Sequence, residues 1–599
     1  MKRLILGFVL AVILRCGIAS ADTHYVSPYG VDIYPYTSWI NAADSIQKAI
    51  DAASYGDTVL VGAGTYKELI NMIPGIALIG AGMDSCMIDG RRTVPENYTM
   101  IKGADSSTIE GFHLRGGYPD YTNCRGVLSD SLYGWSLKRI SNNKISNFWE
   151  GIGMGGRVNT EISNNIFVDN YSGIRPLFFA RGVIVNNTFT DNHKAVSMWV
   201  SAGPTIIKNI MTNTTTRAID GDFTDSMFVE NNLIVVDKWS CISLQNYSGE
   251  FRTAPIRNNT LIGDDTVFAG FHGLVIRIGG FSNEIKNNVI SEGFYGIVAV
   301  NDEGYNCNPQ VSYNDLWNNE QNYYVYGGAS IDTSLGGNIY LDPMFVGGGD
   351  YHLQYGSPCI DAGNPSIKDQ DSSISDIGCY GGAWGETYTY LDYPPKAPDS
   401  LRATSLNTVI ILSWKPNTES DLSHYLVYKD TLAGFMPDTF KIVANIPKDS
   451  SVFRDYDFIL GNTYYYQVSA WDSTGHESEY SDELEVMATS VGEFTEQENR
   501  PPMYQLFQNY PNPFNSSTVI WYYLPDVGYQ PAEVEITVYN LLGKLVRTLV
   551  RERQYPGEHK VVWDGKDDAE NEVASGIYFC KLKVSGLDLV KPRKMVLLR

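Results

Sequence analysis

The pattern of apolar and polar positions repeats with a step near 22 residues through the middle of the chain. In each copy an asparagine pair precedes two apolar or β-prone residues. The pairs are Asn142-Asn143, Asn164-Asn165, Asn186-Asn187, Asn231-Asn232, Asn258-Asn259 and Asn287-Asn288, with Lys208-Asn209 and Tyr313-Asn314 as degenerate copies. Successive pairs lie 22, 22, 22 and 23 residues apart, and then 27, 29 and 26. A period of this length with β-branched residues after each pair predicts one coil of a β-solenoid per repeat.

A second series of short segments lies between the asparagine pairs and predicts strands with one buried face. The segments are 151–154, 173–176, 195–198, 218–221 and 241–244, and their second and fourth residues are mostly apolar. Because side chains alternate along a strand, those residues should point into the coil and their neighbours outward. Asparagine tolerates the left-handed backbone of a sharp corner, and stacked asparagines can form amide ladders. We therefore predict an all-β parallel solenoid, since a β-sandwich with asparagine-rich turns would not keep a constant step.

The segments on either side of the repeats indicate how the solenoid begins and ends. Residues 45–53 have apolar positions at helical spacing, which predicts an amphipathic helix over the first coil. Residues 45–68 and the closing motifs resemble the family of bacterial right-handed parallel β-helix proteins, which is related in fold to pectate lyases. The closing motifs are 341–345, 350–353, 356–363 and 376–381. The resemblance covers about residues 22–385 and implies the fold but no single activity, because the family includes lyases, hydrolases and epimerases.

Two small β-sandwich domains are predicted after the solenoid. A proline-rich linker at 386–396 precedes residues 397–488, which alternate at strand period and resemble a fibronectin type III module with Trp414 in its core. We expect this module to act as a spacer, and exposed aromatic residues that bind sugar are the alternative.

A second linker at 489–503 leads to a final domain at 504–599. Its motifs at 506–515, 538–543, 556–559, 563–565, 575–579 and 594–598 resemble the C-terminal sorting domain of type IX secretion cargo. An ordinary immunoglobulin-like module would share its fold. The sorting resemblance implies a bacterium with two membranes, the type IX secretion machinery as partner, and release or anchoring at the outer-membrane surface.

The first 21 residues have the features of a signal peptide. A basic start and an apolar stretch at 4–14, too short to span a bilayer, precede the small residues Ala19-Ser20-Ala21. Cys16 could suggest a lipoprotein, but Arg15 before it fits a lipid-attachment site poorly. No later apolar run is long enough to cross a membrane, so we expect a secreted or surface protein with no transmembrane segment in the mature chain.

Charge and cysteine content narrow the possible partners. The net charge is −23, which repels phosphate backbones and disfavours nucleic acid as a partner. Removal of Cys16 with the signal peptide leaves seven of the eight cysteines, too few for a disulfide scaffold. Cys359 and Cys379 occupy closing-segment positions where the β-helix family usually has alanine, and the intervening loop is short. We therefore predict a disulfide between these two residues.

The resemblance to pectate lyases implies a ligand cleft along the outward side of the 151–154 type segments. One outward row is Gly153, Arg175, Ser197, Asp220, Ser243, Arg277 and Val298, and the next is Gly155, Leu177, Trp199, Asp222, Gln245, Gly279 and Val300. We expect Arg175, Trp199, Asp220, Asp222 and Arg277 to share one exposed face. Four coils span roughly 15 Å at the strand spacing, which suits several sugar units. Trp199 would provide a stacking platform, and Gln245 a further substrate contact.

Two chemistries fit these residues. In a lyase, Asp220 and Asp222 would hold calcium against a uronate carboxylate while Arg175 or Arg277 removes the ring proton. In a glycoside hydrolase, the two aspartates would be acid and base, because an i, i+2 spacing of about 7 Å fits inversion.

The polygalacturonase pattern is matched only in part. Asp264-Asp265, His272-Gly273 and Arg277-Ile278 occur in its order, but the last two pairs share one segment and Gly279 replaces a lysine, so chance explains the match better. A non-catalytic structural or adhesive protein, with the β-helix as a rigid stalk, stays open beside the polysaccharide-active reading.

Overall fold

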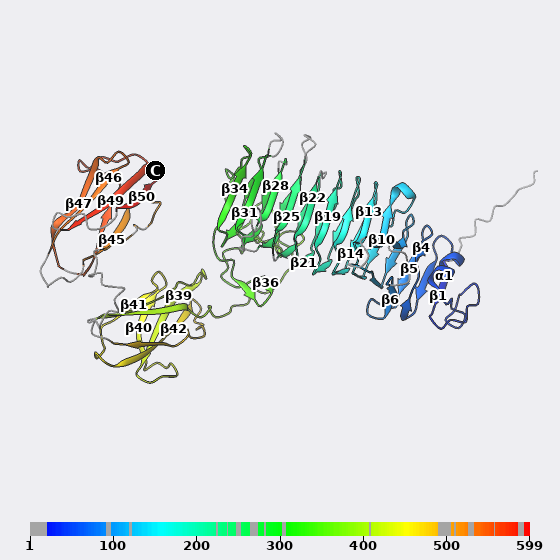
Figure 1. Ribbon diagram of the computed structural model, residues 1–599, viewed down its shortest axis with the longest axis horizontal. Helices are drawn as coiled ribbons and strands as arrows, with labels where there is room; N and C mark the ends of the chain where they lie inside the picture. Colours follow the sequence, from blue (N-terminus) through cyan, green and yellow to red (C-terminus); the bar gives the residue numbers. More distant parts are fainter. Residues whose placement is uncertain are drawn as a thin grey trace, which may run out of the picture. The chain divides into compact units, whose positions relative to one another are not determined.

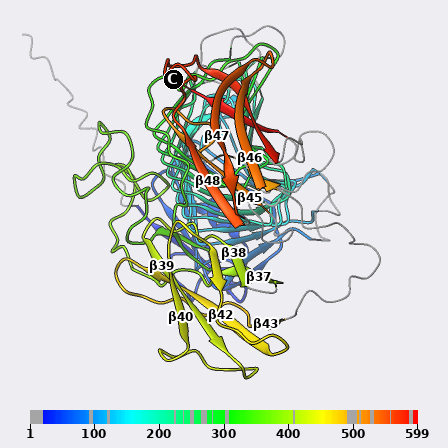
Figure 2. The same cartoon turned by 90° about the vertical axis from the view of Figure 1, so that its left-hand side faces the viewer.

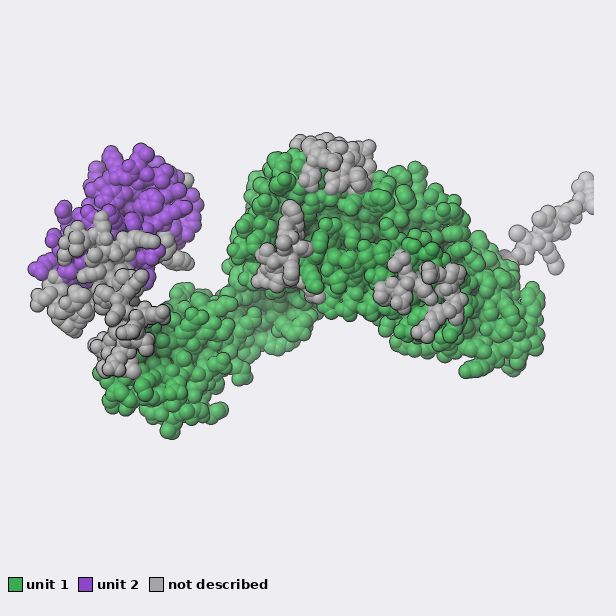
Figure 3. All heavy atoms as spheres, in the orientation of Figure 1, with its two compact units in different colours: residues 1–488 green, residues 489–599 purple. Residues whose placement is uncertain are grey.

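The chain folds almost entirely as β-strands. The computed structural model describes residues 21–91, 97–118, 123–222, 226–236, 238–246, 253–263, 274–280, 283–301, 307–406, 409–488, 505–507, 509, 511–524, 532–555, 557–584 and 592–598. The signal peptide predicted at 1–21 lies outside these residues apart from Ala21. Two compact units, 1–488 and 489–599, are described separately (Figure 3). No helix in the described part of the chain is long and apolar enough to cross a membrane.

Three parallel sheets form the solenoid in the first unit (Figure 1). The first sheet contains β1 (Thr23–Val26), β2 (Thr58–Val61), β5 (Ala77–Gly80), β8 (Thr108–Glu110), β11 (Arg139–Ser141), β14 (Asn159–Ser163), β17 (Arg181–Val185), β20 (Thr205–Ile207), β23 (Phe228–Glu230), β26 (Ile256–Arg257), β29 (Glu284–Lys286) and β32 (Gln310–Ser312). The second contains β4 (Ile70–Asn71), β7 (Thr99–Lys102), β10 (Arg125–Asp130), β13 (Glu150–Gly155), β16 (Ser172–Pro176), β19 (Lys194–Trp199), β22 (Arg217–Asp222), β25 (Ser240–Gln245), β28 (Leu274–Gly279), β31 (Tyr295–Val300) and β34 (Gln321–Tyr326). The third contains β3 (Gly64–Tyr66), β6 (Cys86–Asp89), β9 (His113–Arg115), β12 (Lys144–Ser146), β15 (Ile166–Val168), β18 (Thr188–Thr190), β21 (Ile210–Thr214), β24 (Leu233–Val236), β27 (Thr260–Ile262), β30 (Val289–Ser291) and β33 (Asp315–Trp317). Each regular coil gives one strand to each sheet, as the repeat predicted.

The asparagine pairs form the corner between the first and third sheets. The first residue of each pair has a positive φ, between 49° and 57°, which confirms the predicted left-handed corner. The second residue is buried, and its side-chain Nδ2 donates to Oδ1 of the equivalent asparagine one coil further on. Asn143 Nδ2, for example, lies 3.0 Å from Asn165 Oδ1, and the series continues through Asn187, Asn209, Asn232, Asn259, Asn288, Asn314 and Asn338. The predicted amide ladder is confirmed and runs along the inside of the solenoid.

Apolar residues fill the interior and helix α1 covers its first coil. The inward row of the second sheet is fully buried, and its members are Val127, Ile152, Ile174, Val196, Ile219, Ile242, Ile276 and Ile297. Helix α1 (Ile46–Ala52) buries Ile46, Ala49 and Ile50 against the first coil. The predicted amphipathic cap is therefore confirmed.

After β34 the chain returns along the asparagine corner. This closing segment, residues 341–386, includes a small antiparallel pair, β35 (Phe345–Gly347) and β36 (Asp350–Leu353). Outward asparagines of the corner hold it: Asn231 Nδ2 donates to Cys379 O at 2.9 Å, and Asn258 Nδ2 donates to Ser375 Oγ at 2.9 Å. The first asparagine of a pair thus has a second role beyond the corner itself.

The predicted Cys359–Cys379 disulfide is wrong, because both residues are free, buried thiols. The Cys359 thiol donates to Asp315 Oδ2 of β33 at 3.3 Å. The backbone N–H of Cys379 donates to Thr260 Oγ1 of β27 at 3.0 Å, and β27 lies two strands from β33 in the third sheet. The two cysteines are therefore anchored on different coils, whereas a disulfide needs Cα atoms within about 7 Å.

The buried carboxyl of Asp315 should make the closing segment sensitive to pH. Burial raises its pKa to about 7. Because the folded chain then holds this proton more tightly than the unfolded chain, the stabilising contribution of Asp315 is complete below about pH 4 and is lost by about pH 7. Urea unfolding across this range should show that decline in the natural sequence and less of it in Asp315→Asn, whose amide does not ionise. An identical pH dependence in both would contradict the assignment.

Two β-sandwiches follow the solenoid, which confirms the predicted fold class (Figure 2). In the first, β37 (Asp399–Leu406), β38 (Val409–Lys415) and β41 (Val452–Asp455) face β40 (Ile442–Pro447), β39 (Leu422–Asp430), β42 (Thr463–Asp472) and β43 (Leu484–Met487). Trp414 lies in its core, as predicted. The second unit has two sheets around its own hydrophobic core. One sheet contains β44 (Gln505–Leu506), β45 (Thr518–Leu524) and β48 (Gly557–Trp563), and the other contains β47 (Leu545–Gln554), β46 (Ala532–Asn540), β49 (Gly576–Val584) and β50 (Arg593–Leu597).

Candidate functional site

The strand register of the second sheet places the predicted outward residues side by side. Ser197 lies opposite Asp220, and Trp199 lies opposite Asp222. In the later, longer coils Ser243 is paired with Arg277, and Gln245 with Gly279. The two rows predicted from the sequence therefore exist with the expected members, from β13 to β31.

The exposure of these residues differs from the prediction at one position. Trp199 is 46% exposed, whereas Arg175, Asp222, Gln245 and Arg277 are half-buried. Asp220 is only 4% exposed. The expectation that all five charged and aromatic residues would be exposed is thus wrong for Asp220, because cationic neighbours on the outer face cover its carboxylate.

A third outward row begins each strand and was missed from the sequence. Its members are Arg125, Glu150, Ser172, Lys194, Arg217, Ser240 and Leu274. From Arg125 to Arg217 the residue that follows each member is glycine or alanine and also faces the interior, so strict alternation counted from the buried aliphatic residue assigns the row to the wrong side. Gly151 shows why that next position is small, since an added Cβ would lie 2.5 Å from Gly173 O. A repeated Gly or Ala before the aliphatic residue was the available signal.

Two clusters on these rows share one arrangement, a buried carboxylate between two cations. In the first cluster the Glu150 carboxylate, whose side chain is 2% exposed, pairs with Arg125 and with Arg175, and Arg175 Nη1 lies 2.5 Å from Glu150 Oε1. In the second, Asp220 pairs with Lys194 through Oδ2, and with Arg217 through Oδ1 at 2.9 Å. Each cluster therefore carries a net positive charge when all its groups are ionised.

The second cluster changes the roles open to Asp220. Both of its oxygens are bonded to cations, so a calcium ion would have to displace Lys194 or Arg217. The same pairing makes Asp220 a counter-ion for these cations rather than a readily available acid or base. Its neighbour Asp222 has a raised pKa, caused by burial and then by the charge of Asp220, so Asp222 keeps its proton to higher pH than an ordinary aspartate.

The three outward rows carry a small excess of positive charge, although the chain is strongly negative. From β10 to β28 the three outward rows contain five cationic side chains, Arg125, Arg175, Lys194, Arg217 and Arg277, and four carboxylates, Asp130, Glu150, Asp220 and Asp222. The chain carries a net charge of −23. The three rows therefore carry one net positive charge when all these groups are ionised, whereas the chain as a whole is negative.

Aromatic residues border the charged rows on both sides. On the side of the third row, Trp149 and Tyr171 stack with ring centroids 3.8 Å apart, and Tyr171 stacks on His193 at 4.6 Å. Stacking therefore covers much of the faces of these three rings. On the opposite side, Phe178, Phe179 and Trp199 are 44%, 48% and 46% exposed. These side chains are exposed to solvent, and Arg157 lies over the Phe179 ring at 6.0 Å from its centroid.

The polygalacturonase-like residues do not extend this site. Asp264, Asp265, His272 and Gly273 lie outside the described residues, and only Arg277 of that series belongs to the face. The interpretation of this pattern as a chance match therefore stays a prediction from the sequence.

Comparisons with known proteins agree with the fold. Residues 131–273 match the family model for the right handed beta helix region, and residues 528–587 match that for the FlgD Ig-like domain. The second match corresponds to the immunoglobulin-like alternative for the final domain. No curated protein matches the chain.

Solved structures similar to the chain align over limited parts of it. The Clostridium perfringens spore cortex lytic enzyme SleM has 23% identity, with 18% of this chain and 32% of the enzyme covered and a TM-score of 0.14. The third fibronectin III domain of human KIAA0343 protein has 15% identity and a TM-score of 0.15, and the alignment covers 19% of this chain and 98% of that domain. The FN1–FN3 domains of chicken CNTN1 have 14% identity, 39% and 86% coverage and a TM-score of 0.15. Scores this low carry no argument about function.

Proposed function

We propose that this is an exported protein that binds an acidic polysaccharide along the outward face of the second sheet. The observation that carries the proposal is the pair of clusters in which one buried carboxylate holds two cations in place. Cations fixed in this way lose little side-chain freedom when an anion binds, which reduces the cost of binding. A polymer carrying carboxylate or sulfate groups on successive units is the ligand that fits such a row.

The dimensions of the face suit a polymer. Arg125 on β10 and Arg277 on β28 are separated by six strand steps, about 29 Å at a spacing of about 4.8 Å. Trp199 lies in the middle of this span and can stack on a sugar ring, while Asp222 and Gln245 beside it can bond hydroxyl groups. Anionic groups would then meet the cations on either side.

Binding should be strongest for a uronate polymer and should weaken with salt, because the attraction is between charges at a surface. With polygalacturonate as probe, Arg277→Gln and Trp199→Ala should each lower the affinity by about tenfold. Arg181→Gln is the matched control, since Arg181 is an exposed arginine on β17 of the first sheet. Equal affinity for a neutral polysaccharide, or no effect of either face substitution, would contradict the proposal.

Cleavage is a second candidate function, favoured by the raised pKa of Asp222 opposite Trp199. A carboxyl that keeps its proton to higher pH than usual and lies beside an exposed tryptophan is a candidate general acid. A uronate lyase, with Arg277 as base, is the other chemistry. Incubation of the protein with polygalacturonate distinguishes the two chemistries. Hydrolysis gives new reducing ends only, whereas a lyase also gives unsaturated ends that absorb ultraviolet light. Asp222→Asn should abolish hydrolysis; binding without products supports a binding or adhesive protein.

Export by a type IX secretion machinery completes the proposal. The motif series from Leu506 to Leu598 supports it, together with the signal-peptide features of residues 1–21. An acidic polysaccharide large enough to span the face would be met outside the cell, so a secreted or surface location agrees with the ligand class.

A further inference from the structure

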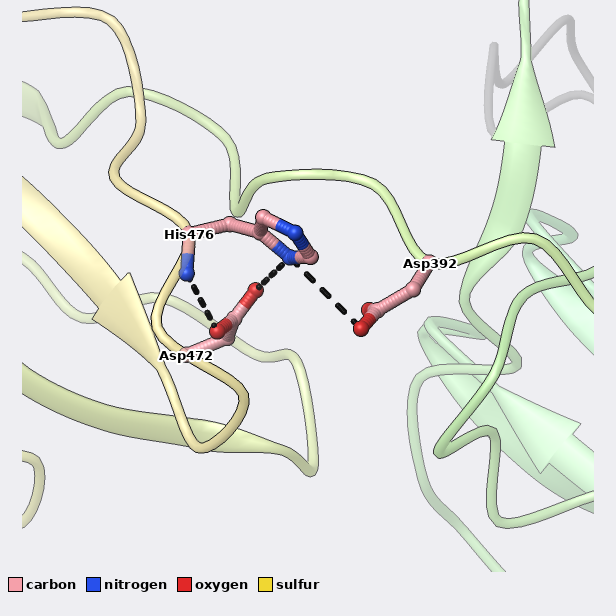
Figure 4. A group of neighbouring side chains, drawn as sticks. All are labelled: Asp392, Asp472 and His476. Carbon is pink, nitrogen blue, oxygen red and sulfur yellow. Dashed lines mark hydrogen bonds and ion pairs between the residues drawn. The ribbon is translucent and has the colours of Figure 1, made fainter.

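A histidine and two aspartates meet where the connecting segment after the solenoid reaches the fibronectin-like module (Figure 4). His476 Nδ1 lies 3.1 Å from Asp472 Oδ2 and 3.5 Å from Asp392 Oδ2. The ligand atoms of the three residues all lie within 4.8 Å of one another. Asp392 belongs to the connecting segment, whereas Asp472 ends β42 and His476 lies in the turn that follows.

The turn holds the Asp472 side chain in place without any ligand. Asp472 Oδ1 accepts hydrogen bonds from the backbone N–H groups of Thr474, Gly475 and His476 at 2.9, 2.7 and 2.8 Å. The Asp472 side chain is 0% exposed, and its other oxygen, Oδ2, points at the His476 ring (Figure 4). The fully buried carboxylate is therefore oriented so that one oxygen faces the space between His476 and Asp392.

Two further carboxylate oxygens around this point lack hydrogen bonds. Asp392 Oδ1 and Asp421 Oδ2 are buried from solvent and have no hydrogen-bond partner within the part of the chain that the structure describes. Asp421 is held beside the turn by the backbone, because Ser473 N–H donates to Asp421 O at 2.9 Å and the next residue, Leu422, pairs with Asp472 in the sheet. Buried carboxylate oxygens without partners are costly unless a cation meets them.

We propose that Asp392, Asp472 and His476 bind a divalent transition-metal ion such as Zn²⁺, with Asp421 beside them as a further carboxylate. The imidazole nitrogen decides the class of ion, because Zn²⁺ and its neighbours accept nitrogen and carboxylate oxygen together, whereas Ca²⁺ takes oxygen ligands. The ion would take the place of the proton between His476 Nδ1 and Asp472 Oδ2. Since Asp392 comes from the connecting segment, the bound ion would fasten that segment to the module.

The full chain, stripped of metal with a chelator, tests this by calorimetric titration with Zn²⁺ and by the visible absorption of added Co²⁺. We expect one equivalent to bind, Ca²⁺ to bind more weakly, and Asp392→Asn and His476→Gln each to lower the Zn²⁺ affinity by about tenfold or more. The Co²⁺ absorption should change in His476→Gln, because a nitrogen ligand is lost. His424→Gln, a partly exposed histidine of the same module, is the matched control and should bind as before.

Folding and binding are separated by the position of Asp392. This residue lies outside the strands of the module, so Asp392→Asn decides the question even if His476→Gln destabilises the turn. Absence of a stoichiometric ion, or binding that survives both substitutions, would overturn the proposal.

Discussion

Replacement of Asn187 by alanine is expected to lower the free energy of unfolding of the solenoid by about 4 kcal/mol. The Asn187 side chain donates to Ile162 O, Val185 O and Asn209 Oδ1 at 2.9 to 3.0 Å. Its own Oδ1 accepts from the backbone and side-chain amides of Asn165. Truncation therefore removes several buried hydrogen bonds at once and leaves donors and acceptors on two adjacent coils without partners.

The neighbouring residue provides a matched control. Asn186 faces outward with φ 54°, a conformation that glycine adopts freely, so Asn186→Gly should change stability by less than about 1 kcal/mol. Denaturant unfolding followed by circular dichroism measures both variants. Equal losses at the two positions would show that the corner, rather than the buried ladder, is the source of stability.

Deletion of residues 504–599 is expected to stop export while leaving the rest of the chain folded. The final domain has its own hydrophobic core, and the solenoid and the fibronectin-like module each have theirs. The truncated protein should therefore accumulate in the periplasm of a bacterium with a type IX secretion machinery. Fractionation of cells and medium measures this.

A deletion of the module at 397–488 is the control for chain length, and it should still reach the surface or the medium. Normal export of the chain that lacks 504–599 would contradict the sorting role and would favour an ordinary immunoglobulin-like domain.

The repeat predicted the solenoid because one period carries both its corner and its buried strand. Ile174, Val196 and Ile219 set the register of the second sheet, and the observed pairing follows them. The ladder was likewise predictable, since the second asparagine recurs at each step. Local periodicity is sufficient here because each coil contacts mainly its neighbours.

The parts that were missed depend on side chains reaching across coils. Glu150, Lys194 and Arg217 were overlooked because the small residue after each also turns inward. The burial of Asp220 follows from its two cationic neighbours, which a single strand does not reveal. The closing segment lies over Asn231 and Asn258, and its hydrogen bonds join residues more than a hundred positions apart in the sequence. A local sequence pattern therefore does not predict its path.

The buried ladder has a consequence for how the protein can change in size. Since every link joins one asparagine to an equivalent asparagine on the next coil, a whole coil can be gained or lost without changing the chemistry of any link. The closing segment is hydrogen-bonded to Asn231 and Asn258, so an inserted or deleted coil there would displace it. We therefore expect the gain or loss of a coil to be tolerated best among the regular coils before Asn231. The length of the solenoid can thus change in steps of one coil, and each coil adds about 4.8 Å along its axis.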